Sequence, residues 1–454
     1  MKHLLYIVLL FLCFVSLQSC EDFLEVPAPK DQIDIGKVFN DDRLAVSALM
    51  QVYTDVRTTG FLSGAQNGIG FLMGNYTDEL EATTTQMPDF RVFYQGNVTS
   101  TNNAVNQIWR ATYKQIYMLN NIIEGVENSQ GVTTVVKKQI QGEAFALRGI
   151  LHFYLTQTYG EVPYVNTTDY ILNSKISKIT TEAAMDLAIA DLLLAEEFLS
   201  QGTGAASFEK VRISALAVQA FLARMYLYQQ NWERAQFYAN QVIGQMDLSA
   251  TALANVFLKG STSAIWQLKP DTEGRNTIEA DSYIFVSEPA PQAKLSTSLY
   301  TSFEGNDLRK QFWVKQVGSS AHANKYKQRG FTPSTLEYSI IIRLEEMYLI
   351  GAEAAAEMED LLTCQMLLNT LRDRAGLLGI TITNKPMAIG YILQERRVEL
   401  FCEFGHRFYD LKRKGMLNQL TQTKANWQTH FELLPLPDAE LLLNANLKPQ
   451  NFGY

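Results

Sequence analysis

The residues with the clearest potential for acid–base chemistry form an acidic cluster, Asp78, Glu79 and Glu81. Two carboxylates at a suitable separation can hydrolyse a glycosidic bond, one as the acid and the other as the base or nucleophile. These carboxylates are nearly contiguous, however, and the sequence identifies no catalytic partner for them. Hydrogen bonding to a ligand, or solvation in a loop, is the favoured interpretation, and we predict no catalytic residue.

Other signatures of catalysis or metal binding are absent from the sequence. The histidines do not lie within metal-ligand spacing of one another, and there is no HExxH motif, Cys/His cluster, GxSxG elbow or GxxxxGK[ST] loop. The sequence thus provides no positive signal for an enzyme, a metal site or a cofactor.

The composition is typical of a folded protein without a nucleic-acid partner. Hydrophobic residues make up 47% and charged residues 19% of the 454 residues, as in globular chains. The formal net charge is −8, whereas nucleic-acid-binding proteins normally carry a basic surplus.

Residues 1–19 are predicted to be a signal peptide rather than part of the fold. The apolar run from Leu4 to Leu17 is too short for a comfortable membrane span. The Ser19-Cys20 pair that follows resembles a bacterial lipobox, which predicts that Cys20 is lipidated and becomes the mature N-terminus. The alternatives are ordinary cleavage beside an incidental cysteine and an uncleaved anchor. Residues 20–38 are then expected to form a lipidated tether.

Helical periodicity recurs in pairs along the rest of the chain, which predicts a mainly α fold. Small alanines on facing helices, with an aromatic residue at the turn, resemble tetratricopeptide (TPR) units. A generic helical bundle remains the alternative. The four predicted pairs are 41–57 with 104–127, 135–159 with 180–200, 212–229 with 232–246, and 339–358 with 360–374.

Two long segments do not fit this helical pattern. Residues 58–103 are rich in Gly, Thr, Asn and aromatic residues, and residues 247–338 contain prolines and short β-like runs such as 264–268. Irregular segments of this length usually carry function. We therefore expect these irregular, β-containing insertions to form the ligand face on a TPR-like scaffold.

The densest charged segment is residues 395–413, in which aromatic residues are interleaved with the charges. Opposite charges three residues apart lie beside each other on a helix. An anion site is one interpretation, but a partly buried ion-pair network that holds the terminal helices is favoured. The pairs with this spacing are Arg396–Glu399, Arg407–Asp410 and Asp410–Arg413.

This segment also resembles the C-terminal signature of the SusD/RagB family. The resemblance extends upstream to residues 343–376 and 142–163 and downstream to 434–454, so it covers essentially the whole mature chain. The residues that fit the signature are Glu395, Arg396, Glu399, Leu400, Glu403, Gly405, His406, Arg407, Asp410, Leu411 and Arg413. On this basis residues 39–246 form an N-terminal helical half and residues 247–454 a C-terminal half.

The resemblance implies a lipid-anchored protein on the extracellular face of a bacterial outer membrane. Such a protein binds a nutrient oligomer and delivers it to a SusC-type TonB-dependent transporter, with helices of the N-terminal half facing the transporter. An oligosaccharide is the expected ligand, and a peptide, as in RagB-like proteins, is the alternative. An enzyme or a bare TPR scaffold is less favoured.

The candidate ligand residues are aromatic, amide and charged side chains of the two insertions. Flat aromatic faces cover the apolar C–H surfaces of sugars, and polar groups at the rim orient them. For each aromatic residue, simple packing within the insertion is the alternative. The predicted residues are Asn75, Tyr76, Asp78, Phe90, Arg91, Tyr94, Tyr283 and Trp313.

Overall fold

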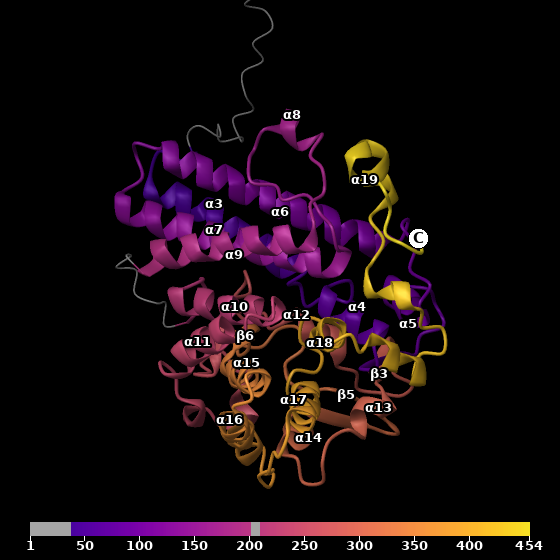
Figure 1. Cartoon of the computed structure of the whole chain (residues 1–454). Coiled ribbons are helices and arrows are strands. Elements are labelled where there is room, and N and C mark those ends of the chain that lie inside the picture. The colour runs from indigo at the N-terminus through magenta and orange to yellow at the C-terminus, as the bar shows by residue number, and fades with distance from the viewer. Residues whose placement is uncertain (1–37, 201–208) are drawn as a thin grey trace, which may run out of the picture.

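A computed structural model describes residues 38–200 and 209–454 of the chain (Figure 1). Cys20, the predicted signal peptide and all but the last residue of the predicted tether lie outside the described residues. None of the described helices is long and apolar enough to cross a membrane.

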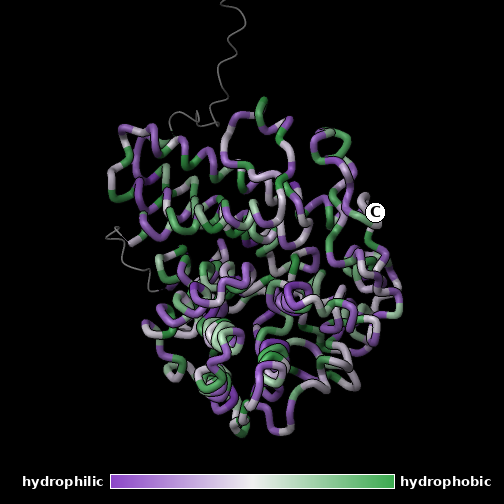
Figure 2. The backbone as a smooth tube through the Cα atoms, viewed as in Figure 1, coloured by the Kyte–Doolittle hydropathy of each residue, from purple (hydrophilic) through white to green (hydrophobic). Residues whose placement is uncertain are grey.

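The first two predicted helical pairs are confirmed. Helix α3 (Asp42–Thr58) pairs with α6 (Asn103–Asn128), and α7 (Thr134–Tyr159) pairs with α9 (Thr181–Ser200). Figure 1 shows these helices side by side in one layer, drawn in indigo to magenta. Along them, hydrophobic and hydrophilic residues alternate with the turns of the helix (Figure 2), so each helix has a buried face.

The third and fourth predicted pairs also form and extend the stack. They are α10 (Ala215–Tyr228) with α11 (Trp232–Ile243), and α15 (Leu344–Glu357) with α16 (Leu361–Arg374). Helix α11 packs against α15 although about a hundred residues separate them in sequence. The TPR-like scaffold expected from the periodicity is therefore the architecture of the protein.

One boundary of the fourth pair was predicted wrongly. Residues 339–343 are not helical but form strand β6 (Ser339–Arg343), which pairs antiparallel with β2 (Ala264–Leu268). The consecutive isoleucines of β6 favour a strand, and their partner strand lies far away in sequence. The β-like run expected at 264–268 is confirmed.

The two insertions contain more regular structure than expected. The first holds α4 (Ile69–Tyr76), strand β1 (Leu80–Ala82) and α5 (Asp89–Gln95). The second holds strands and short helices: α12 (Ile278–Tyr283), β3 (Ala293–Leu295), α13 (Thr297–Tyr300), α14 (Leu308–Trp313), β4 (Val314–Val317) and β5 (Ser320–Ala323). Strand β1 pairs antiparallel with β3, which brings the two insertions together.

The C-terminal chain returns from the helical stack to the N-terminal half. Its elements are α17 (Lys385–Glu399), α18 (His406–Arg413), η4 (Leu417–Gln422), η5 (Thr429–Glu432), α19 (Asp438–Leu443) and η6 (Ala445–Leu447). The Leu434 amide donates to the Thr158 carbonyl at 2.9 Å, and the Asn451 side chain donates to the Tyr159 carbonyl at 2.7 Å. Figure 1 shows this yellow tail beside the N-terminal helices.

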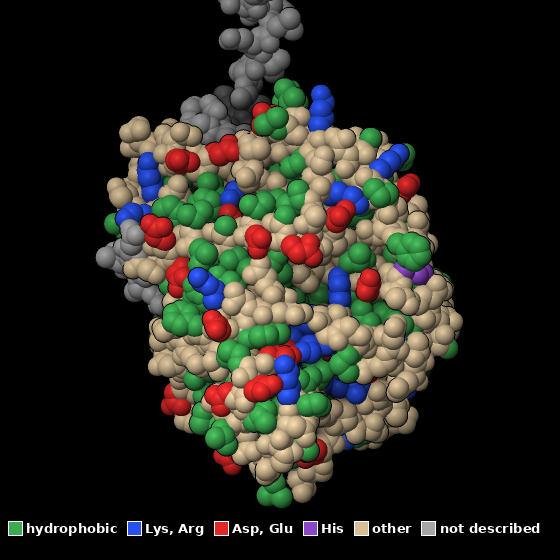
Figure 3. Space-filling view, in the orientation of Figure 1, with side chains coloured by type: hydrophobic (Ala, Val, Ile, Leu, Met, Phe, Trp, Pro, Cys, Tyr) green, Lys and Arg blue, Asp and Glu red, His purple; other side chains and the backbone are tan. Residues whose placement is uncertain are grey.

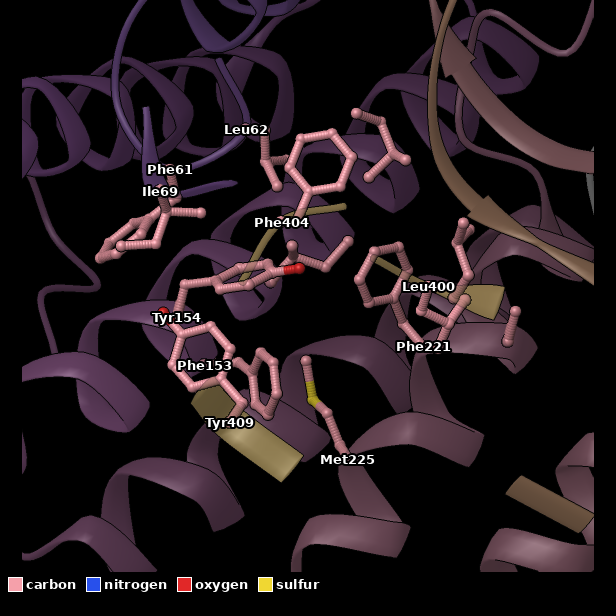
Figure 4. Close-up of a cluster of buried hydrophobic side chains, with 14 of the residues drawn as sticks. Phe61, Leu62, Ile69, Phe153, Tyr154, Phe221, Met225, Leu400, Phe404 and Tyr409 are labelled. Carbon is pink, nitrogen blue, oxygen red and sulfur yellow. The ribbon is translucent and has the colours of Figure 1, made fainter. Parts of the chain in front are cut away.

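A cluster of buried aromatic side chains joins the two halves (Figure 4). Phe61 stacks on Tyr154 with ring centroids 5.6 Å apart, and Tyr154 meets Tyr409 edge-on at 6.0 Å. Trp109 and Trp266 are also buried, whereas Trp232 is only partly buried against this core. This shared core fixes the insertions relative to the helical stack.

Candidate ligand-binding site

The first insertion and the C-terminal chain meet at the end of helix α5. Helix α5 ends at Gly96, whose left-handed backbone (φ 69°) is one that a side chain would strain. A Cβ atom at this position would also lie 3.0 Å from a ring carbon of Phe431. Gly96 therefore lets α5 approach η5 closely, and the Asn426 side chain donates across the junction to the Gln95 carbonyl at 3.3 Å.

A cavity of about 290 Å³ opens at this junction, and we call it the Tyr94 cavity. Its walls contain the side chains of Tyr94 and Trp427, with the amides of Gln95 and Asn426 beside them. Planar amides beside aromatic rings are a composition suited to sugars. The lining residues are Tyr76, Phe93, Tyr94, Gln95, Gly96, Thr423, Lys424, Ala425, Asn426, Trp427 and Phe431.

The ammonium group of Lys424 lies over the ring of Tyr94, 3.8 Å from its centroid. It donates one hydrogen bond, to the Asn75 carbonyl at 2.7 Å. Burial lowers the pKa of Lys424 to about 7, and the carboxylates of Asp78 and Glu81 oppose that shift only in part. A cation–π contact of this kind is a modest substitute for a carboxylate partner.

Paired charges lie near Tyr94, on strands β1 and β3. Strand register places Glu81 opposite Lys294, and their side chains form an ion pair at 3.3 Å. Arg91, one turn before Tyr94 on α5, donates to the Thr84 carbonyl. Both Arg91 and Tyr94 are partly exposed, as a ligand contact requires.

Five of the predicted ligand residues are buried in the core, and one of them, Tyr76, also lines the Tyr94 cavity, so their role in ligand binding stays a prediction. Their exposed fractions lie between 0% and 9%. They sit on short helices whose inner faces pack against the core, whereas the sequence had suggested open loops. The five are Asn75, Tyr76, Phe90, Tyr283 and Trp313.

Each of these side chains has an internal role. Tyr76 packs against Phe93 and Trp427, with ring centroids 5.5 Å and 5.4 Å away, and thereby forms the floor of the Tyr94 cavity. The Tyr283 hydroxyl donates to the Cys402 carbonyl at 3.3 Å, and the Trp313 indole donates to the Leu253 carbonyl at 3.1 Å.

Asp78 is also buried, and it forms ion pairs with two arginines. Arg407 binds both of its carboxylate oxygens, at 2.8 and 3.0 Å, and Arg397 adds a contact at 2.7 Å. Burial alone would raise the pKa of Asp78, but these two guanidinium groups lower it below its usual value. Its neighbour Glu79 accepts from the Cys402 amide at 3.3 Å, and burial raises the pKa of Glu79 to about 7.

The charged segment 395–413 forms two helices rather than one. Residues 400–405 turn the chain between α17 and α18, so Arg396 pairs with Asp410 at 2.7 Å and not with Glu399. The expected Arg407–Asp410 pair is replaced by the pairing of Arg407 with Asp78. The expected pair between Asp410 and Arg413 is present at 2.9 Å.

The structural interpretation of this segment is confirmed by a buried network that we call the Arg343 cluster. Arg343 contacts Glu399 at 2.6 Å and Glu403 at 2.9 Å, and Arg309 contacts Glu395 at 2.5 Å. Lys325 and Arg343 lie near the rings of Trp313, Phe257 and Phe401. The cluster consists of Arg309, Lys325, Arg343, Glu395, Glu399 and Glu403 with these three rings.

A second, larger cavity of about 560 Å³ lies between α6, the segment that carries α8 (Tyr170–Asn173), and α19. We call it the α6–α19 cavity. Its lining includes Trp109, Tyr117 and several aliphatic side chains, and one opposite-charge pair of residues, Arg110 and Glu440. Figure 3 shows hydrophobic side chains gathered at the top of the molecule, over α8.

Lys424, Asn426 and Trp427 belong to the site but were not predicted from the sequence. They lie in a short irregular stretch between the charged segment and the C-terminal motif, both of which were interpreted as structural. A tryptophan beside Lys, Asn and Gln was the available signal. In the described parts of the chain, no group of three or more His, Cys, Asp or Glu residues is arranged to hold a metal ion.

Comparison with known proteins decides the family. Residues 22–227 match a family described as starch-binding and associating with the outer membrane, and residues 300–454 match the SusD family. This chain belongs to the SusD family. A SusD-like protein of Formosa agariphila is 24% identical over 96% of this chain and 98% of its own length.

Solved structures of SusD-family proteins share the fold of the chain. A SusD superfamily protein from Bacteroides vulgatus superposes with a TM-score of 0.79 at 20% identity, covering 92% of this chain and all of its own. A structure described as a laminarin-binding SusD-like protein has a TM-score of 0.74 at 21% identity, with 92% and 100% covered. At this identity the likeness establishes the fold alone.

Proposed function

We propose that this SusD-family protein binds an oligosaccharide in the Tyr94 cavity at the surface of the outer membrane and delivers it to a SusC-type transporter. The observation that carries the proposal is the combination of Tyr94 and Trp427 with exposed planar amides in one open cavity. Sugars present both apolar C–H faces and hydroxyl groups, so they need this mixture. A structural neighbour described as laminarin-binding supports a carbohydrate over other ligands.

The ligand class is tested by a binding screen on the full-length chain in mild detergent. We expect binding to one class of oligosaccharide in a panel that includes laminarin fragments, and no binding to a matched panel of peptides. Binding to peptides alone would favour the RagB-like alternative and overturn the carbohydrate proposal. No binding to either panel would contradict the proposed function as a whole.

A binding protein is favoured over a glycosidase because the acidic cluster is already engaged. Asp78 is held by two arginines, Glu81 by Lys294, and Glu79 is buried. We expect any oligosaccharide that binds to be recovered intact after prolonged incubation. Release of shorter products by the pure protein would contradict a purely binding role.

Attachment to the membrane is proposed through Cys20. The apolar run that ends at Ser19-Cys20 motivates this step. Cys20→Ala should move the protein from the outer-membrane fraction to a soluble fraction, as measured by cell fractionation and immunoblotting. Unchanged retention in the outer membrane would refute the lipid anchor.

The transporter complex is proposed to use helices of the N-terminal half. Family membership and the match to a family that associates with the outer membrane support it. Epitope-tagged protein should co-purify with its transporter in mild detergent, and the Cys20→Ala chain should still do so when the two are mixed. Failure of both forms to co-purify would contradict the partnership.

A further inference from the structure

The Tyr94 cavity holds a basic side chain without an acidic partner. Of the described residues that line it, Lys424 is the one Lys or Arg, and none is Asp or Glu. Lys424 forms no ion pair within the described parts of the chain, and Nζ uses one of its three N–H groups in the bond to Asn75. Two strong donor positions are therefore left without a protein acceptor.

The same wall holds a second unused donor. Trp427 is 8% exposed, and its indole nitrogen has no hydrogen-bond partner in the described structure. Tryptophan can donate but not accept, and buried donors are normally satisfied. A cavity whose lining holds a lysine with unused N–H groups, and no carboxylate, favours a ligand that supplies acceptors.

The carboxylates nearest to Lys424 are already committed to other cations. Asp78 is paired with Arg397 and Arg407, and Glu81 is paired with Lys294. Glu79 is buried beneath them and is in part protonated at neutral pH, because burial raises its pKa to about 7. The surroundings of the cavity are thus locally basic although the whole chain carries a formal net charge of −8.

We propose that the Tyr94 cavity binds an acidic sugar, with a carboxylate or sulfate group placed at the Lys424 ammonium. This proposal rests on the proposed function, because it names the class of oligosaccharide that the same cavity accepts. An anion at this point gains a charge-assisted hydrogen bond in a poorly solvated place, where such bonds are strong. A neutral glucan offers the ammonium only hydroxyl and ring oxygens, which are weaker acceptors than an anion.

Binding of an acidic sugar should change the protonation of Lys424. Lys424 is partly neutral at pH 7 in the free protein, because burial lowers its pKa to about 7. An anion stabilises the ammonium form, so binding takes up protons between about pH 6 and pH 8.5. The groups that face Lys424 are the Tyr94 ring, the Asn75 carbonyl, and Asp78 and Glu81 at longer range. The affinity for an acidic sugar should therefore rise as the pH falls through this window.

The test compares three oligosaccharides of equal length on the full-length chain in mild detergent: a neutral laminarin fragment, an oligogalacturonate and a sulfated galactan fragment. Calorimetry should show at least about tenfold tighter binding of one or both acidic probes, and this advantage should weaken with added salt. Proton uptake on binding is measured by repeating the titration in buffers of different ionisation enthalpy. Preference for only one acidic probe identifies carboxylate or sulfate as the bound group.

Variants separate this proposal from the function on which it rests. Lys424→Met should abolish the acidic preference and the proton uptake while weak binding of the neutral probe persists, and Lys424→Arg should retain the preference without proton uptake. Lys114→Met, which changes an exposed lysine on α6, should behave as wild type. Equal binding of neutral and acidic probes, unaffected by Lys424→Met, would overturn the acidic-sugar proposal but leave the oligosaccharide function intact. No binding of any sugar would overturn both.

Discussion

The Arg343 cluster and the Tyr94 cavity both place cations against aromatic rings, but their charges are matched very differently. In the Arg343 cluster every cation has at least one carboxylate within 3.1 Å, and all members except the partly exposed Glu403 are buried. In the Tyr94 cavity the ammonium of Lys424 faces a ring and a carbonyl, and solvent reaches the cavity.

This difference separates a structural cluster from a binding site. Buried charges that are fully paired hold elements together, and their removal leaves an uncompensated charge. A partly buried cation without a carboxylate partner destabilises the fold unless a ligand supplies the missing acceptor. The segment with the densest charges in the sequence, residues 395–413, therefore belongs to the structural cluster. The candidate site has a single Lys or Arg in its lining.

Removal of Arg343 is expected to have the largest effect. Arg343→Met leaves Glu399 and Glu403 without their main partner, which should lower the free energy of unfolding by about 3–5 kcal/mol. Denaturant unfolding measures this change. The exposed Arg234→Met on α11 is the control and should change it by less than about 0.5 kcal/mol. An unaltered unfolding midpoint for Arg343→Met would contradict a stabilising role for the Arg343 cluster.

Removal of the aromatic wall should affect binding rather than stability. Tyr94→Ala should weaken oligosaccharide binding by about 1–3 kcal/mol, because a partly exposed aromatic anchor is lost. Calorimetry on the folded variant checks this. The matched control is Tyr117→Ala, which removes a 46% exposed tyrosine from the α6–α19 cavity and should leave binding unchanged. Weaker binding by Tyr117→Ala together with unchanged binding by Tyr94→Ala would indicate that the ligand binds in the α6–α19 cavity.

Lys424→Met should stabilise the protein in a pH-dependent way. An unfolded lysine has a pKa of about 10.4, and burial lowers that of Lys424 to about 7. The folded state therefore binds fewer protons, and the resulting cost is complete below pH 7 and disappears as the pH rises towards 10. The free energy of unfolding of the variant should exceed that of the wild type at pH 6, and this difference should have nearly disappeared at pH 10. A pH-independent difference would show that Lys424 is not desolvated.

The smallest expected effect concerns the rim amide. Asn426→Ala removes an exposed amide from the cavity lining, so binding should weaken by about 0.5–1 kcal/mol. Stability should be nearly unchanged, because the one hydrogen bond lost within the protein is that to the Gln95 carbonyl. Calorimetry under the conditions used for Tyr94→Ala measures it. A loss larger than that for Tyr94→Ala would mean that polar contacts, and not the aromatic wall, dominate recognition.

The helical scaffold was predictable because its signals are local. Apolar periodicity and the alanines of facing helices placed the third pair, predicted at 212–229 and 232–246, close to its observed bounds. The failure at 339–343 has the opposite cause, since β6 is stabilised by pairing with β2, which lies about seventy residues earlier. Local patterns do not report such distant partners.

The candidate site was predictable only in part. Composition indicated the insertion that lines the Tyr94 cavity, and Arg91 and Tyr94 are partly exposed there. Phe90, directly before Arg91, is buried against Phe71 with ring centroids 5.2 Å apart, because a short helix turns adjacent side chains to different sides. The sequence could not indicate which side would face the core.

The sequence by itself determined the family, the helical pairs and the irregular insertions, because each depends on motifs or periodicities within a few turns of chain. The tertiary structure alone decided which side chains are available to a ligand. Lys424 and Tyr94 are some 330 residues apart and meet only because the C-terminal chain folds back onto α5. Burial and charge pairing are properties of such long-range contacts, and they distinguish the paired Asp78 from the unpaired Lys424.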